Sequence, residues 1–150
     1  MQLTQKENGL LKDMKDQEKI CVEKYTKYAQ DANDPQLKDL LQAIAQVEQG
    51  HLNTLGQIEN GPVPQSTSSQ SGVNRTFSAT YSTVNDDAKQ KDAYLCSDLL
   101  STEKHVSGLY DTCIFEFKSE QVRNVLNHIQ KEEQEHGKML YDYMSVNSMY

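Results

Sequence analysis

Two glutamate–histidine pairs with the same spacing occur in this chain of 150 residues. Glu48 and His51 are three residues apart, and so are Glu133 and His136. Side chains three apart on an α-helix project from the same face, so each pair can present a carboxylate and an imidazole to one point. Oxygen and nitrogen ligands of these kinds bind transition-metal ions. The doubled pair therefore predicts a metal site, provided that both pairs lie on buried helix faces.

The sequence around each pair predicts a long helix whose apolar stripe includes the pair. Apolar residues recur at steps of three and four on both sides of the pairs, the pattern of a helix with one buried face. Around the first pair these residues are Leu37, Leu41, Ile44, Leu55 and Ile58. Around the second pair they are Val122, Leu126, Ile129, Leu140 and Tyr143. Both pairs are therefore expected on the buried side.

Two further helices are expected, and each carries one glutamate on its apolar stripe. Glu18 interrupts the stripe that includes Leu11 and Tyr25, and Glu103 interrupts the stripe that includes Leu99 and Tyr110. Turn signals such as Asp34-Pro35 and Ser119 separate neighbouring helices. We predict helices over about 4–32, 34–59, 86–117 and 119–146, forming two antiparallel hairpins in one domain. The polar stretch of about 60–85 is expected to cross the length of an all-α four-helix bundle.

An internal repeat places these residues in register. Shifting the second half back by 85 residues aligns Glu103 with Glu18, Glu133 with Glu48 and His136 with His51. Glu18 and Glu48 are also equally distant from the first turn, about 20 Å along their helices. The sequence therefore predicts a single layer at the middle of the bundle that contains Glu18, Glu48, His51, Glu103, Glu133 and His136.

Burying four carboxylates and two imidazoles without partners would cost several kcal/mol each. Two metal ions would neutralise them, with Glu48 and Glu133 placed to bridge and Glu18 and Glu103 as terminal ligands. Fe or Mn suits this donor set best, and Zn is a third option. The alternative is a hydrogen-bonded, metal-free cluster of Glu and His. Tyr25 and Tyr110 are either neighbours of the metal ligands or ordinary core tyrosines.

Composition excludes several classes of function. The formal net charge of −7 and the pI near 5.0 argue against binding to nucleic acid or to an anionic membrane surface. We expect no membrane-spanning segment and no signal peptide, hence synthesis in the cytoplasm. Three cysteines without a CxxC pair are expected to be free thiols.

A Glu on each of two helices and Glu-x-x-His on the other two is typical of ferritin-like di-iron and di-manganese proteins. Residues 3–61, and above all their segments DPQLKDLL and EQGHLNTL, resemble the spore coat protein F family, a ferritin-like group. The resemblance extends to both hairpins. It implies the same six metal ligands, assembly in the mother-cell cytoplasm, location in the spore coat, and other coat proteins or self-association as partners.

Two functions follow from these expectations. The first is a structural or accessory coat protein that carries a di-metal site. The second is a di-iron or di-manganese oxidoreductase that acts on peroxide or dioxygen, for which no catalytic residue is assigned. The missing CxxC pair disfavours a rubrerythrin, because that enzyme has an additional iron bound by cysteines.

Overall fold

Four helices account for most of the computed structural model, which describes residues 2–65, 75–82 and 86–150. They are α1 (Gln5–Asp31), α2 (Pro35–Asn60), α3 (Asp87–Glu116) and α4 (Glu120–Val146). No strand occurs in these three ranges, so the expected all-α class is confirmed. Each helix end lies within one residue of the predicted position. Of the predicted connection over 60–85, residues 66–74 and 83–85 lie outside the described residues.

Capping residues at the helix N-termini explain why the sequence predicted where the helices begin. The Thr4 hydroxyl accepts a hydrogen bond from the Glu7 amide at 3.1 Å, and the Glu7 carboxylate accepts one from the Thr4 amide at 2.7 Å. Asp34 and Ser119 cap α2 and α4 in the same manner, each with a side-chain oxygen that accepts from the first turn. These bonds satisfy amide groups that have no partner inside a helix.

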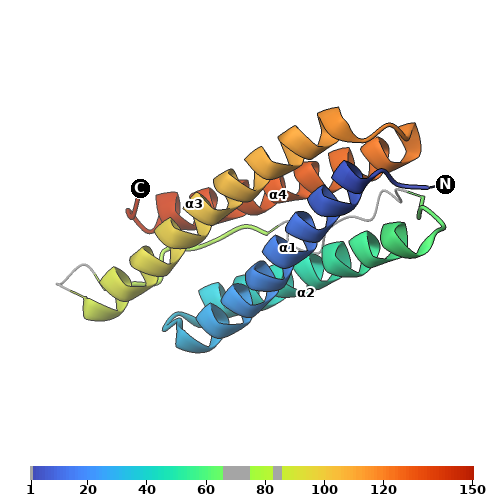
Figure 1. Cartoon of the computed structure of the whole chain (residues 1–150). Helices are drawn as coiled ribbons and strands as arrows, with labels where there is room; N and C mark the ends of the chain where they lie inside the picture. The colour runs from blue at the N-terminus through green and yellow to red at the C-terminus, as the bar shows by residue number, and fades with distance from the viewer. Residues whose placement is uncertain (1, 66–74, 83–85) are drawn as a thin grey trace.

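The four helices pack as two antiparallel hairpins, α1 with α2 and α3 with α4. The hairpins meet through contacts of α1 with α3 and of α2 with α4. As Figure 1 shows, α2 ends and α3 begins at opposite ends of the molecule, so these two helices run in the same direction. The molecule is therefore a helical bundle in which all four helices can bring side chains to one central layer.

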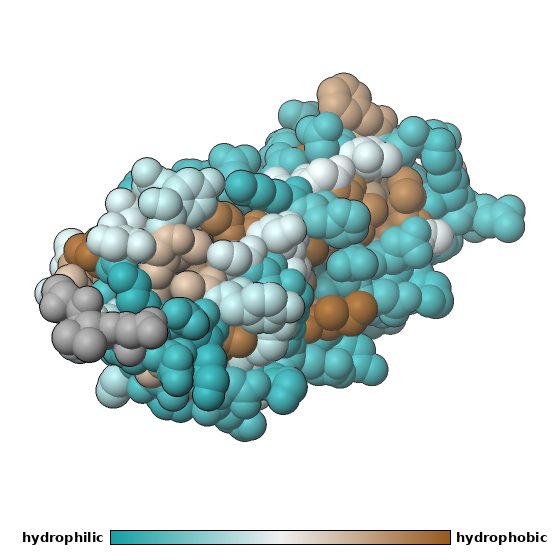
Figure 2. Space-filling view, turned by 90° about the vertical axis from the view of Figure 1, so that its left-hand side faces the viewer, coloured by the Kyte–Doolittle hydropathy of each residue, from teal (hydrophilic) through white to brown (hydrophobic). Residues whose placement is uncertain are grey.

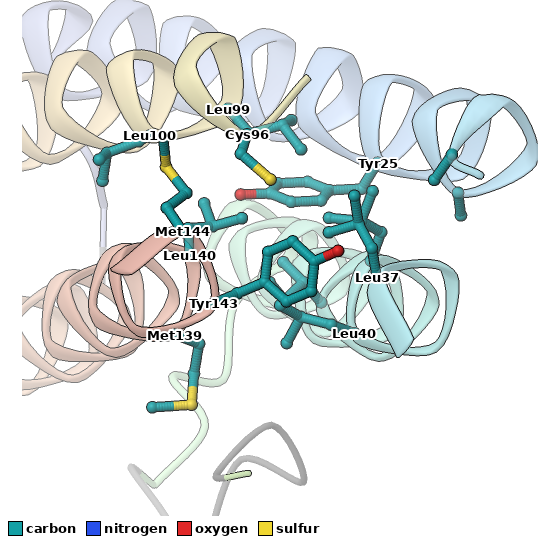
Figure 3. Packing of buried hydrophobic residues seen from close by; sticks show 14 residues of the cluster. Tyr25, Leu37, Leu40, Cys96, Leu99, Leu100, Met139, Leu140, Tyr143 and Met144 are labelled. Carbon is teal, nitrogen blue, oxygen red and sulfur yellow. The ribbon is translucent and has the colours of Figure 1, made fainter. Parts of the chain in front are cut away.

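Two apolar clusters form the core, one toward each end of the bundle. The first includes Tyr25, Leu40 and Leu140 (Figure 3), and the second includes Leu11, Leu55 and Val106. On α2, α3 and α4 the two clusters are separated by the polar residues that the sequence singled out, which are Glu48, His51, Glu103, Glu133 and His136. The apolar packing on both sides therefore holds the predicted layer in place.

A network of hydrogen bonds ties residues 75–82 to the end of the bundle near the α1–α2 turn. The hydroxyls of Tyr143 and Thr80 donate to Asp34 Oδ2 at 2.6 and 2.7 Å. Asp92 accepts bonds from the amides of Asn33 and Asp34 at 2.9 and 3.0 Å. Residues 75–82 of the connection between the hairpins are thus held in place at this end of the molecule.

Replacing Asp34 with asparagine should lower the free energy of unfolding by about 1.5–3 kcal/mol at neutral pH, the usual worth of hydrogen bonds to a charged group. Burial acts to raise the pKa of Asp34, but the bonds from Tyr143, Thr80 and the Gln36 amide hold it below its ordinary value. A lowered pKa in the folded state stabilises the protein above the pKa of the unfolded chain, and this contribution is lost as the pH falls through the folded pKa. Urea unfolding of both proteins should therefore show a difference that shrinks from pH 7 toward pH 3. An equal difference at both pH values would contradict this role.

The surface is mixed in character. In the face shown in Figure 2, hydrophilic residues predominate and hydrophobic residues appear in separate patches. The most exposed large apolar side chains, Phe115 at 84% and Tyr94 at 71%, are 21 positions apart on α3 and do not form one patch. None of the described helices is both long and apolar enough to span a membrane. Cys21, Cys96 and Cys113 are buried and form no disulfide.

Candidate metal centre

The structure brings all six predicted residues together at the centre of the bundle. They are Glu18, Glu48, His51, Glu103, Glu133 and His136, and none has more than 3% of its surface exposed. We call these residues the polar layer. Potential ligand atoms form two groups within which all atoms lie within 4.8 Å of one another. The first group comprises Glu18, Glu48, His51 and Glu133, and the second comprises Glu48, Glu103, Glu133 and His136. Glu48 and Glu133 are therefore shared by both groups.

His51 turns its Nδ1 atom toward the centre of the layer. This nitrogen lies 3.1 Å from Glu133 Oε1, 3.2 Å from Glu48 Oε2 and 3.7 Å from Glu18 Oε1. The other ring nitrogen, Nε2, points outward and lies 3.2 Å from Glu132 Oε1. Nδ1 is thus the atom available to a cation in the first group.

His136 has the same orientation in the second group. Its Nδ1 lies 3.1 Å from Glu48 Oε1 and 3.3 Å from Glu103 Oε1. Its Nε2 is buried and has no hydrogen-bond partner among the described residues. The two imidazole rings lie nearly parallel, with centroids 6.1 Å apart. In both groups the histidine presents Nδ1 to the other ligands. The groups differ because Nε2 of His51 contacts Glu132, whereas Nε2 of His136 contacts no described hydrogen-bond partner.

Two buried tyrosines hold the terminal carboxylates. Tyr110 donates its hydroxyl proton to Glu18 Oε1 at 2.5 Å, and Tyr25 donates to Glu103 Oε1 at 2.6 Å. Each tyrosine thus contacts the glutamate of the other hairpin, rather than the one on its own helix. Burial, together with the negative charge of the neighbouring glutamates, raises the pKa of both phenols. Both tyrosines therefore stay protonated and act as donors that orient the carboxylates.

Several atoms of the polar layer are buried without a hydrogen bond. They are Glu18 Oε2, Glu103 Oε2, both carboxylate oxygens of Glu133, and His136 Nε2. Each buried polar atom left unsatisfied costs about 1–3 kcal/mol. Three of the four carboxylates thus have an oxygen that no hydrogen bond in the described structure uses, although Glu133 Oε1 lies within ion-pair distance of His51 Nδ1, at 3.1 Å. This donor set fits cations, because a cation would engage those oxygens directly.

Without a cation, the layer has to be neutralised by protons. Burial and the neighbouring Glu48 raise the pKa of Glu18 to about 8, and burial and the charge of Glu103 raise the pKa of Glu133. Burial acts to lower the pKa of His136, but Glu103 and Glu48 raise it to about 9. A metal ion has to displace these protons to bind.

One functional candidate was absent from the predicted set. Glu132, 7% exposed, lies between His51 Nε2 at 3.2 Å and His128 Nε2 at 3.1 Å. Sequence reasoning missed it because the shift of 85 residues aligns Glu132 with Val47, so the repeat gives no signal there. The side chain of His128 is 26% exposed. The four-residue step from His128 to Glu132 on one helix was the available signal.

Replacing Glu132 with alanine should weaken metal binding about 10- to 100-fold, the usual effect of losing the acceptor that orients a histidine ligand. Without Glu132, the His51 ring loses the bond that fixes its tautomer and its orientation. Calorimetric titration of the metal-free protein with Mn²⁺ measures the loss. Glu23→Ala, which removes an exposed carboxylate from α1, is the matched control. Equal affinity in both variants would show that Glu132 has no part in the site.

Comparison with known proteins found a match to one protein family. Residues 91–150 match the family model described as the Coat F domain, which supports the expected relation to the coat F family. The match includes most of α3 and all of α4, hence Glu103, Glu133 and His136. Residues 3–61, on which the resemblance was mainly based, lie outside it. No curated protein matches the chain. No solved structure matches it either.

Proposed function

We propose that this chain is a ferritin-like protein of the spore coat type whose polar layer binds two metal ions. The observation that carries the proposal is the pair of four-residue groups that share Glu48 and Glu133, with buried carboxylate oxygens free of hydrogen bonds. A purely structural cluster would gain by satisfying those oxygens, because unsatisfied buried groups are rare in folded proteins.

The donor set indicates which ions the layer would hold. Each group supplies three carboxylates and one imidazole, a combination that favours Fe or Mn and accepts Zn. Glu48 and Glu133 would bridge, Glu18 and Glu103 would each bind one ion, and His51 and His136 would each supply Nδ1. The bound ions would supply Lewis acidity and, for Fe or Mn, one-electron chemistry.

The Coat F match supports a structural or accessory role in the spore coat. We infer synthesis in the mother-cell cytoplasm and assembly with other coat proteins or with further copies of this chain. The ions would then act mainly as internal cross-links between the two hairpins, because each group takes ligands from both.

One observation favours an alternative, an oxidoreductase that acts on peroxide or dioxygen. The buried phenols of Tyr25 and Tyr110 donate to the two carboxylates, Glu103 and Glu18, that are not shared. Phenols so close to redox-active ions are able to exchange electrons and protons with them.

Purification in the presence of Fe²⁺ or Mn²⁺, followed by elemental analysis and a peroxide-consumption assay, separates these functions. Two ions per chain with turnover would support the oxidoreductase. Two ions without turnover would support the coat metalloprotein. A natively folded protein that takes up no metal would contradict both.

A further inference from the structure

A pocket of about 500 Å³ lies between α3 and α4. Its outer walls include Lys104, Lys138 and the aromatic pair Tyr141 and Tyr150. Its inner lining includes Glu103 and Glu133 of the polar layer. The pocket therefore connects the solvent-facing surface of the second hairpin with two of the proposed metal ligands.

The inner end of the pocket is closed by two buried glutamates of the polar layer. Glu103 and Glu133 are 3% and 1% exposed. Glu103 Oε2 and both oxygens of Glu133 accept no hydrogen bond within the described residues. These two carboxylates belong to the group that also contains His136. A molecule in the pocket would thus approach the ion held by that group.

A pocket of the first hairpin, of about 440 Å³, has a different lining. Its residues include Leu52, Asn53 and Gly56 but neither Glu18 nor Glu48. The shift of 85 residues aligns Leu52 with Gly137, which lines the α3–α4 pocket. A Cβ atom at Gly137 would lie 3.6 Å from Leu100 Cδ1, in ordinary contact. The missing side chain at Gly137 therefore leaves room beside Leu100 in the α3–α4 pocket.

We propose that this pocket binds a small organic anion, a carboxylate with a flat apolar body, whose carboxylate reaches the ion held by Glu103, Glu133 and His136. This inference rests on the proposed metal centre, because the two glutamates alone would repel an anion. The volume suits a small organic ligand rather than a diatomic one.

The chemistry of the walls selects this class of ligand. Lys104 and Lys138 place positive charge at the rim, where it attracts anions, although Asp142 partly neutralises Lys138 at 2.5 Å. Leu100 and Gly137 provide an apolar wall, and the edge-to-face contact of Tyr141 with Tyr150, at 4.8 Å between centroids, provides an aromatic one. A flat ring can pack against both surfaces.

Titration of the manganese-loaded protein with benzoate, followed by calorimetry, tests the proposal. We expect one benzoate to bind per chain, and binding to disappear when a chelator removes the metal. Gly137→Leu, which reproduces the residue of the other hairpin, should weaken benzoate binding about 10- to 100-fold by filling the pocket. Gly137→Ala, the smaller change, should weaken it less, and Gly56→Leu on α2 should leave it unchanged.

The metal content of every sample separates the possible failures. A loaded protein that binds no benzoate, or binds it equally well after Gly137→Leu and Gly137→Ala, would overturn the pocket proposal and leave the metal centre standing. Equal binding before and after chelation would also overturn it. A protein that takes up no metal would overturn both the metal centre and the pocket proposal.

Discussion

Replacing Glu48 and Glu133 together with glutamine should reduce the bound metal from two ions per chain to none. Both residues belong to both ligand groups, so the double substitution leaves each group with one carboxylate and one imidazole. A neutral amide is a much poorer ligand for Fe or Mn than a carboxylate. The measurement is elemental analysis of protein purified in the presence of Mn²⁺.

The same variant should keep its four helices, because glutamine has the shape of glutamate and the apolar clusters on both sides are untouched. Far-ultraviolet circular dichroism checks this point. Glu23→Gln combined with Glu59→Gln, at the helix surface, is the matched control and should retain both ions. Retention of two ions by the Glu48 and Glu133 variant would show that the metal binds elsewhere.

Loading the protein with metal should raise its free energy of unfolding by about 4 kcal/mol for each ion present at a thousandfold excess over its dissociation constant. The unfolded chain cannot present either ligand group, so binding favours the folded state alone. For a chain of 150 residues, each ion should raise the melting temperature by about 8–16 °C. Scanning calorimetry with Mn²⁺ and then with a chelator measures the effect and its reversal.

The variant that lacks Glu48 and Glu133 provides the control for this experiment, since Mn²⁺ should leave its melting temperature unchanged. If the wild-type protein melts at the same temperature with and without Mn²⁺, the polar layer is a metal-free cluster that protons and hydrogen bonds satisfy.

The sequence was sufficient to predict the helices and the meeting of the six residues. Steps of three and four specify a helix face, and Asp34-Pro35 and Ser119 specify where helices begin. Glu18 and Glu48 lie equally far from one turn, so an antiparallel hairpin has to bring them level. Local rules were enough here because the layer depends on helix periodicity and turn position.

Contacts between the hairpins could not be predicted in the same way. Periodicity places Tyr25 on the buried face of α1, but the packing of α1 against α3 decides that its hydroxyl reaches Glu103. Glu132 was missed because the repeat gives no signal there, and because its contact with His51 depends on how the two hairpins pack.

The repeat also suggested two equal halves, and the structure shows that they differ. His51 has Glu132 as a partner, whereas His136 Nε2 has none in the described part of the chain. The second half in turn has Gly137 where the first has Leu52, and with it the pocket that reaches Glu103 and Glu133. The two halves of the layer therefore differ in what orients the histidine and in the pocket beside the carboxylates.

The central claim is that one layer holds two ions that share Glu48 and Glu133. Electron paramagnetic resonance of the metal-free protein, recorded during titration with Mn²⁺, tests it most directly. Carboxylates shared by two ions couple their spins, so we predict that two ions bind per chain and give the spectrum of an exchange-coupled pair. A spectrum of isolated, uncoupled Mn²⁺ at saturation, or the absence of any bound Mn²⁺, would contradict the claim.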